Sequence, residues 1–259
     1  MRTRRLVNFG LLFEQSNLEF HEGKMLRHPD RENWTGIAPV IRSVVNPFNK
    51  RMFILGLPRN ASLLDVGCGN NSPKQCKILR PDILYTGIDV GDYVQADDPR
   101  KIADQYLIVA PEDFHSRIAE FRNAFDAVIS AHNLEHCNEP YEVLRAMAGA
   151  LKPGGKLFLA FPAEHTDRLP SRRGSLNFYD DPTHNWLPRY KEVMSMLRSQ
   201  NITPIVAFPK YQPAFKVVQG LVLEPLSRWR GRTMPGTWAI YGFETVVWGQ
   251  KAGRWPADC

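Results

Sequence analysis

Short apolar runs alternate with longer amphipathic stretches through the middle of the chain. Each apolar run is bounded by turn residues, which predicts a buried strand, and the stretches between them predict helices. Such alternation is typical of an α/β fold in which helices cover both faces of a mostly parallel sheet. The predicted strands are Ser62–Val66, Leu84–Asp89, Gln105–Val109, Phe125–Ser130 and Lys156–Phe161, and the predicted helices are Pro73–Leu79, Glu112–Asn123 and Glu139–Leu151.

The pattern loosens after Pro162. Residues 163–188 are polar and rich in Arg, Pro, His and Asp, which predicts a substrate-side segment. Arg189–Ser199 predicts a helix, Ile202–Phe208 a strand, and Trp238–Gln250 a long final strand. The insertion 209–236 contains "FKVVQGLVLEPLSRWRGR", an amphipathic helix by its mixture of apolar and basic residues. Core packing or a lid is favoured for this helix over a membrane-surface element.

Residues 1–60 read as an N-terminal extension, either a lid or a dimer contact, and residues 61–259 as the main domain. The 259 residues carry a net charge of +6. This charge would favour binding of an anionic partner, but it is equally explained by a protein that is merely kept soluble by its charge. None of the four cysteines has CxxC spacing, so a zinc knuckle is not expected and a reducing cytoplasm is the simplest location. No apolar run approaches the ~20 residues that span a bilayer.

The stretch "LLDVGCGNNS" places Gly67 and Gly69 directly after a predicted strand. Glycine lets the backbone approach a ligand closely, and a strand that ends in such a turn is typical of nucleotide sites. Asp89 ends the next predicted strand, 20 residues beyond Gly69, where a carboxylate can accept from both ribose hydroxyls. A nucleoside ligand is therefore predicted.

Two nucleoside cofactors fit this spacing. A dinucleotide would need a third glycine where Ser72 stands, and its pyrophosphate would be repelled by Asp65. S-adenosylmethionine has no phosphate and carries an ammonium and a sulfonium, which an acid at that position favours. An NAD(P)-binding oxidoreductase remains as an alternative.

Four ordered motifs, "LLDVGCGNN", "YTGIDV", "FDAVISAHNLEHC" and "LKPGGKLFLAFP", resemble the class I S-adenosylmethionine-dependent methyltransferases between Ser62 and Pro162. "YGFETVVW" resembles the antiparallel last strand of that family. The resemblance implies a Rossmann-like, doubly wound sheet of seven strands and S-adenosylmethionine as cofactor. The implied cofactor-binding residues are Asp65, Gly67, Cys68, Gly69, Asp89, Val90, Glu112, Ser130, Ala131 and His132.

A hydroxyl acceptor must lose a proton, so a base near the methyl group is expected. The candidates are His132 and His136 after the fourth predicted strand and His184 in the polar segment. Asp180 or Asp181 would orient His184. Arg168, Arg172 and Arg173 would read an acidic group on the acceptor. No metal is favoured, although His132, Glu135 and His136 offer ligands at i, i+3 and i+4.

The string "SRRGSLNFYDDPTH" resembles a subset of these enzymes from bacterial surface-polysaccharide and related sugar pathways. The leading prediction is methyl transfer to a saccharide hydroxyl or a related small molecule in the cytoplasm, by a chain that forms a homodimer. Methylation of RNA is the main alternative, and no DNA partner is expected, because the Asn-Pro-Pro-aromatic motif of base methylation is absent. A scaffold without turnover remains open.

Overall fold

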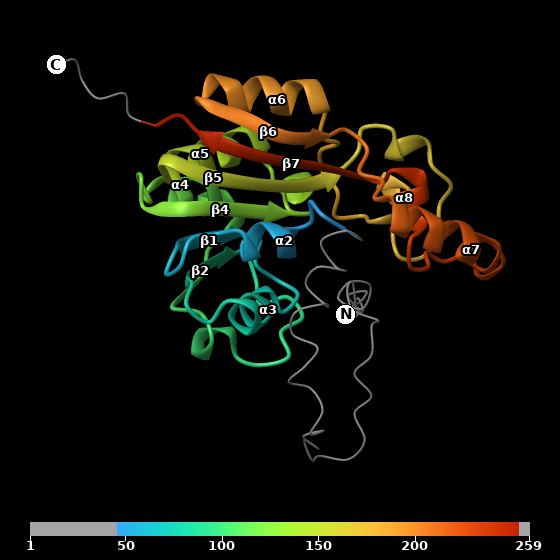
Figure 1. Cartoon of the computed structure of the whole chain (residues 1–259), viewed down its shortest axis with the longest axis horizontal. Helices are drawn as coiled ribbons and strands as arrows, with labels where there is room; N and C mark the ends of the chain where they lie inside the picture. Colours follow the sequence, from blue (N-terminus) through green and yellow to red (C-terminus); the bar gives the residue numbers. More distant parts are fainter. Residues whose placement is uncertain (1–45, 254–259) are drawn as a thin grey trace, which may run out of the picture.

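The computed structural model describes residues 46–253, which form a sheet of seven strands in the order β3-β2-β1-β4-β5-β7-β6 (Figure 1). β7 runs antiparallel to both of its neighbours, β5 and β6, and the other pairs are parallel. This arrangement confirms the predicted fold class. The strands are β1 (Ser62–Val66), β2 (Leu84–Asp89), β3 (Gln105–Ile108), β4 (Phe125–Ala131), β5 (Leu151–Pro162), β6 (Ile202–Phe208) and β7 (Glu244–Lys251).

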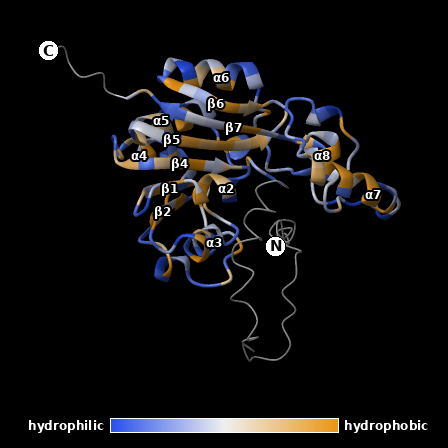
Figure 2. Cartoon of the chain, viewed as in Figure 1, coloured by the Kyte–Doolittle hydropathy of each residue, from blue (hydrophilic) through white to orange (hydrophobic). Residues whose placement is uncertain are grey.

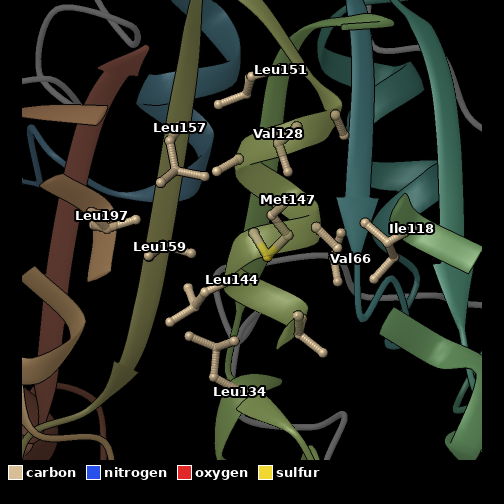
Figure 3. Close-up of a cluster of buried hydrophobic side chains, with 14 of the residues drawn as sticks. Val66, Ile118, Val128, Leu134, Leu144, Met147, Leu151, Leu157, Leu159 and Leu197 are labelled. Atoms are coloured by element: carbon tan, nitrogen blue, oxygen red, sulfur yellow. The ribbon is translucent and has the colours of Figure 1, made fainter. Parts of the chain in front are cut away.

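Alternate strand residues pack into two apolar clusters, one on each face of the sheet. Leu64, Val128 and Leu157 point into the cluster that α4, α5 and α6 cover, part of which Figure 3 shows. Leu63 and Ala127 point into the other, which α2 and α3 cover. The helices are α2 (Lys50–Leu55), α3 (Ser72–Leu79), α4 (Phe114–Ala119), α5 (Pro140–Ala150), α6 (Tyr190–Ser199), α7 (Ala214–Arg230) and α8 (Thr237–Tyr241).

Helix α2 lies within the predicted N-terminal extension, yet its side chains belong to the core. Phe53 is buried, and its ring lies 5.6 Å from that of Phe158 and 5.3 Å from that of Trp248. The indole of Trp248 also donates a 3.0 Å hydrogen bond to the carbonyl of Phe48. The packed domain therefore begins before residue 61. The predicted lid or dimer contact in residues 1–45 lies outside the described residues.

The predicted strand over Trp238–Gln250 is wrong in its first part. Residues from Thr237 to Tyr241 form α8, which two left-handed glycines delimit: Gly236 has a φ of 86° and Gly242 a φ of 60°. The strand begins only at Glu244. The sequence of α8 alternates between polar and apolar residues too little to distinguish a helix from a strand. The two flanking glycines are what separate this helix from the strand that follows. Predicted helix Glu112–Asn123 is also shorter, because α4 ends at Ala119.

The prediction that the insertion packs into the core is also wrong for most of α7. Of its 17 residues only Gly220 and Ser227 are buried. In Figure 1 the helix extends beyond the carboxyl ends of β4 and β5. Within residues 46–253, no helix has the length and apolar character to span a bilayer.

Replacing Phe53 with Ala should lower the free energy of unfolding by about 3–5 kcal/mol, because it removes a ring from the core and leaves a cavity. Denaturant titration followed by circular dichroism measures the change. Ile78→Ala is the control, since Ile78 is 71% exposed and should change stability by less than about 0.5 kcal/mol. Equal effects of the two substitutions would mean that α2 does not stabilise the sheet.

Candidate active site

The turn after β1 needs glycine, because the segment after β4 packs closely against it. Gly67 has a φ of 78°, and a Cβ atom there would lie 2.5 Å from the side chain of Asn133. The amide of Gly69 donates a 2.8 Å hydrogen bond to Asp89 Oδ2, and the amide of Val90 donates one of 2.7 Å to Oδ1. The carboxylate at the end of β2 therefore holds the turn at the end of β1.

Asp65 is paired with a cation of this chain. Its carboxylate is buried, and Oδ2 accepts from Lys50 Nζ at 2.9 Å, from the Tyr85 hydroxyl at 2.7 Å and from the Ser72 hydroxyl. The prediction that this acid meets the ammonium of the cofactor therefore does not hold for Oδ2, where Lys50 supplies the positive charge. Nothing in the sequence near Asp65 indicates that a lysine on α2 packs against it.

Two buried polar atoms on neighbouring strands have no hydrogen-bond partner among the described residues. They are Asp65 Oδ1 on β1 and Ser130 Oγ on β4. Asp65 pairs with Ile129 and Val66 with Ser130 in the register, so both residues lie near the carboxyl ends of their strands, but their side chains point to opposite faces of the sheet. Buried polar atoms are nearly always paired, so each of the two would be satisfied by a polar group on its own face.

Burial raises the pKa of Asp89 to about 6. The hydrogen bonds from the amides of Val90 and Gly69 favour the charged form and offset part of this rise. The carboxylate is therefore mostly ionised at neutral pH. In that form it accepts hydrogen bonds only, as recognition of two ribose hydroxyls requires.

Three other predicted cofactor residues differ in what they offer to a ligand. The Cys68 side chain points into the core, where it lies against Gly87, and burial raises the pKa of its thiol, so only its backbone faces the turn. Ala131 is half-buried at the end of β4. Glu112 is exposed in the short helix before α4, and its contact with the adenine stays a prediction.

His132 is held between two carboxylates. Its Nε2 lies 2.8 Å from Glu244 Oε1, and its Nδ1 lies 3.2 Å from Glu135 Oε1. Burial alone would lower the pKa of His132, but the hydrogen bonds to these two acids outweigh it and raise the pKa to about 10. A protonated imidazole has no lone pair to accept a proton. The pairing with Glu244 on the last strand disfavours His132 as the base, and a catalytic role for His132 stays a prediction.

Glu135, His136 and His184 offer ligand atoms that all lie within 4.8 Å of one another. Glu135 is fully buried, its Oε1 contacts His132, and its Oε2 has no partner among the described residues. His136 Nδ1 lies 2.9 Å from Thr183 Oγ1, and His184 Nδ1 lies 2.6 Å from the carbonyl of Phe178. We call these three residues the His-Glu cluster. It replaces the metal alternative formed by His132, Glu135 and His136.

The Phe178 carbonyl sets the chemistry of His184. A carbonyl oxygen only accepts, so Nδ1 carries the proton and Nε2 keeps its lone pair. Burial also lowers the pKa of His184. Such a lone pair can accept a proton from a hydroxyl or bind a divalent cation together with the two other residues.

The acids and arginines of the polar segment have mainly structural partners. Asp180 accepts hydrogen bonds from the amides of Arg172, Leu176 and Asn177, so it does not orient His184. Asp181 Oδ2 lies 3.8 Å from His184 Nε2.

Arg172 is buried and pairs with Glu224 at 2.7 Å, so its guanidinium is not available to an acceptor, contrary to the prediction. Arg168 and Arg173 are exposed.

Comparisons with known proteins agree with this geometry. Residues 64–159 match the family described as a methyltransferase domain. The matched residues run from β1 into β5 and include the glycine turn, Asp89 and two members of the His-Glu cluster.

The chain is 32% identical over 121 residues to a ubiquinone biosynthesis O-methyltransferase of Xanthomonas axonopodis pv. citri, covering 40% of this chain and 44% of that protein. It is 32% identical over 109 residues to a 27-O-demethylrifamycin SV methyltransferase of Amycolatopsis mediterranei, covering 41% and 40%. An S-adenosylmethionine dependent methyltransferase from Mesorhizobium loti aligns with a TM-score of 0.53 at 13% identity, over 78% of this chain and 97% of that one.

The chain spans less than half the length of the two curated relatives, and the solved structure supports the fold alone. The matches support the predicted class I family, whereas none of them names a saccharide enzyme. S-adenosylmethionine is the cofactor that the match to a methyltransferase domain implies, and two observations fit it. Asp89 presents a carboxylate beside the glycine turn, and Ser130 Oγ lacks a partner among the described residues.

Binding of S-adenosylmethionine should weaken about tenfold between pH 7 and pH 5, because protonation of Asp89 below about pH 6 removes the acceptor for the ribose. The affinity therefore rises with pH and levels off above 7. Calorimetric titration at several pH values measures it.

Asp89→Asn should bind weakly with no dependence on pH in this range. Asp126→Asn is the matched control, since Asp126 pairs with Lys152 and the Ser62 amide, at the amino end of β1 and away from the glycine turn. A wild-type affinity that stays constant from pH 7 to pH 5 would contradict the role of Asp89.

Zn²⁺ titrated into the full chain should bind at the His-Glu cluster, since two histidines and a carboxylate are a common ligand set for zinc. His136→Ala should weaken binding at least about tenfold. His115→Ala is the control, because His115 pairs with Glu139 on the surface. Equal affinities of the two variants would show that the cluster holds no zinc ion.

Proposed function

We propose that this chain transfers a methyl group from S-adenosylmethionine to a hydroxyl of a small-molecule acceptor. The observation that supports this function is the contact between Gly67 and Asn133. Asn133 immediately precedes the short helix Leu134–His136, so the glycine turn and the His-Glu cluster lie on touching segments. A cofactor site and a proton-accepting site that meet in this way suit transfer between two bound molecules.

Each group of this chain has a distinct task in that reaction. When bound, S-adenosylmethionine supplies the methyl group. Asp89 would bind the ribose hydroxyls, and the backbone of Gly67 and Gly69 would hold the amino-acid portion. His184 would accept the proton of the acceptor hydroxyl at Nε2, which makes the acceptor oxygen a better nucleophile. His136 and Glu135 hold the acceptor oxygen near that nitrogen.

One surface cleft, which neither the glycine turn nor the His-Glu cluster lines, lacks the surplus of cations that a nucleic acid would need. The segment after β5 and the start of α6 line a cleft of about 460 Å³. Charged residues of both signs line the cleft. The acids are Glu164, Asp167 and Glu192, and the bases are Arg168, Arg189 and Lys191. A phosphate backbone requires a surplus of cations, whereas a neutral polyhydroxylated molecule is served by such a mixture.

The curated relatives named above are O-methyltransferases, which favours an oxygen acceptor. Within that class a saccharide hydroxyl is one candidate, and a hydroxylated intermediate of ubiquinone biosynthesis is the candidate that the name of the first relative suggests. The cytoplasmic location and the homodimer stay predictions.

Incubation with radiolabelled S-adenosylmethionine and a panel of acceptors tests the proposal. The panel contains free sugars, nucleotide sugars, ubiquinone-pathway intermediates, lipid-linked sugars and RNA. Transfer to a hydroxyl of a small molecule is expected. Transfer to RNA alone, or transfer to nitrogen or carbon, would contradict the proposed acceptor class.

His184→Ala should lower turnover at least ~100-fold while the affinity for S-adenosylmethionine is unchanged, because the variant loses the base and keeps the glycine turn. Single-turnover rates and calorimetric titration separate the two effects. His115→Ala provides the control with full activity. Unchanged turnover in His184→Ala would exclude this histidine as the base.

A further inference from the structure

The solvent-facing side of α7 is apolar over its whole length. Val222 is 74% exposed and Trp229 is 81% exposed, and Phe215, Val218 and Leu221 are each more than half exposed. These residues recur at three- and four-residue intervals, so they share one face of the helix. We call this set the α7 face. Figure 2 shows hydrophobic residues along α7 where it extends from the sheet.

The opposite side of α7 is fixed to the body of the domain. A Cβ atom on Gly220 would lie 2.3 Å from the carbonyl oxygen of Gly236, so the helix and the loop before α8 are in close contact. Glu224 accepts from Arg172 at 2.7 Å and from the Tyr241 hydroxyl at 2.6 Å. These contacts set the rotation of the helix. The α7 face cannot turn inward without breaking them.

The charges around the α7 face are almost all positive. The helix contains Lys216, Arg228 and Arg230, and Arg232 follows two residues later. Its one acid is Glu224, which pairs with Arg172 and Arg228. A surface that offers apolar residues and surplus cations is complementary to one that offers apolar chains beneath anions.

We propose that the α7 face binds the surface of a bilayer that contains anionic phospholipid. The helix is about 25 Å long and lies in the interface, with its apolar side chains among the acyl chains and its arginines at the phosphates. A second copy of the chain is a poorer occupant, because either orientation of two paired α7 helices brings the cations of one against those of the other. This binding is separate from methyl transfer.

Co-sedimentation of the full chain with vesicles tests the proposal. One set of vesicles is phosphatidylcholine, and the other contains 30% phosphatidylglycerol. Binding to the anionic set should be at least about tenfold tighter, since each arginine near such a surface contributes roughly fivefold. Val222→Glu should weaken binding at least tenfold. Ile78→Glu on α3 changes an equally exposed apolar residue on another surface and should bind like the wild type.

Quenching by brominated phospholipid identifies the segment that enters the bilayer. Tryptophan fluorescence should be quenched on binding, and most of the quenching should disappear in Trp229→Phe. Wild-type protein that stays in the supernatant with anionic vesicles would overturn the proposal. So would equal losses in Val222→Glu and Ile78→Glu, or a dimer in analytical ultracentrifugation that Val222→Glu dissociates while vesicle binding is absent.

Discussion

The bond from the Gly69 amide to the Asp89 carboxylate joins the ends of two adjacent strands, and the candidate site depends on it. Parallel strands end at one edge of a sheet and leave backbone groups there that the ladder does not use. Asp89 satisfies two of these amides and stays close to the surface that a ligand reaches. Its burial raises its pKa, so the group that fixes the turn is also a group that a bound diol would stabilise in its charged form.

A second constraint is the neutralisation of buried charge beside that edge. Lys50 on α2 neutralises the charge of Asp65 on β1. His132 neutralises the charge of Glu135 across a tight turn. An isolated buried carboxylate would be costly, so these cations stabilise the fold. The two pairs leave one oxygen of each acid, Asp65 Oδ1 and Glu135 Oε2, without a partner among the described residues.

The fold could be read from the sequence because its signals are local. The alternation of "LLDVG" and "YTGID" with amphipathic stretches needs only the pleat and the helical period, and both strands lie where the pattern places them. The roles of the histidines could not be read in this way. His132 meets Glu244, 112 residues away, and that contact raises the pKa of a residue predicted to be a base. His184 joins His136 only because the polar segment folds back over the short helix after β4. Lys50 gave no signal at all, since a single lysine at the start of a helix has no distinctive spacing.

The last strand occupies an interior place in the sheet. β7 lies between β5 and β6 and pairs with both, whereas β5 also pairs with β4 on its other side. On a ribosome, β6 leaves the exit tunnel before any neighbour exists to pair with it, and its edge stays open until about forty further residues are made. Trp248 on the same strand completes the packing around Phe53. Synthesis of β7 thus completes both the sheet and the core cluster that α2 and α3 cover, so the domain gains its cooperativity only after this strand has been made.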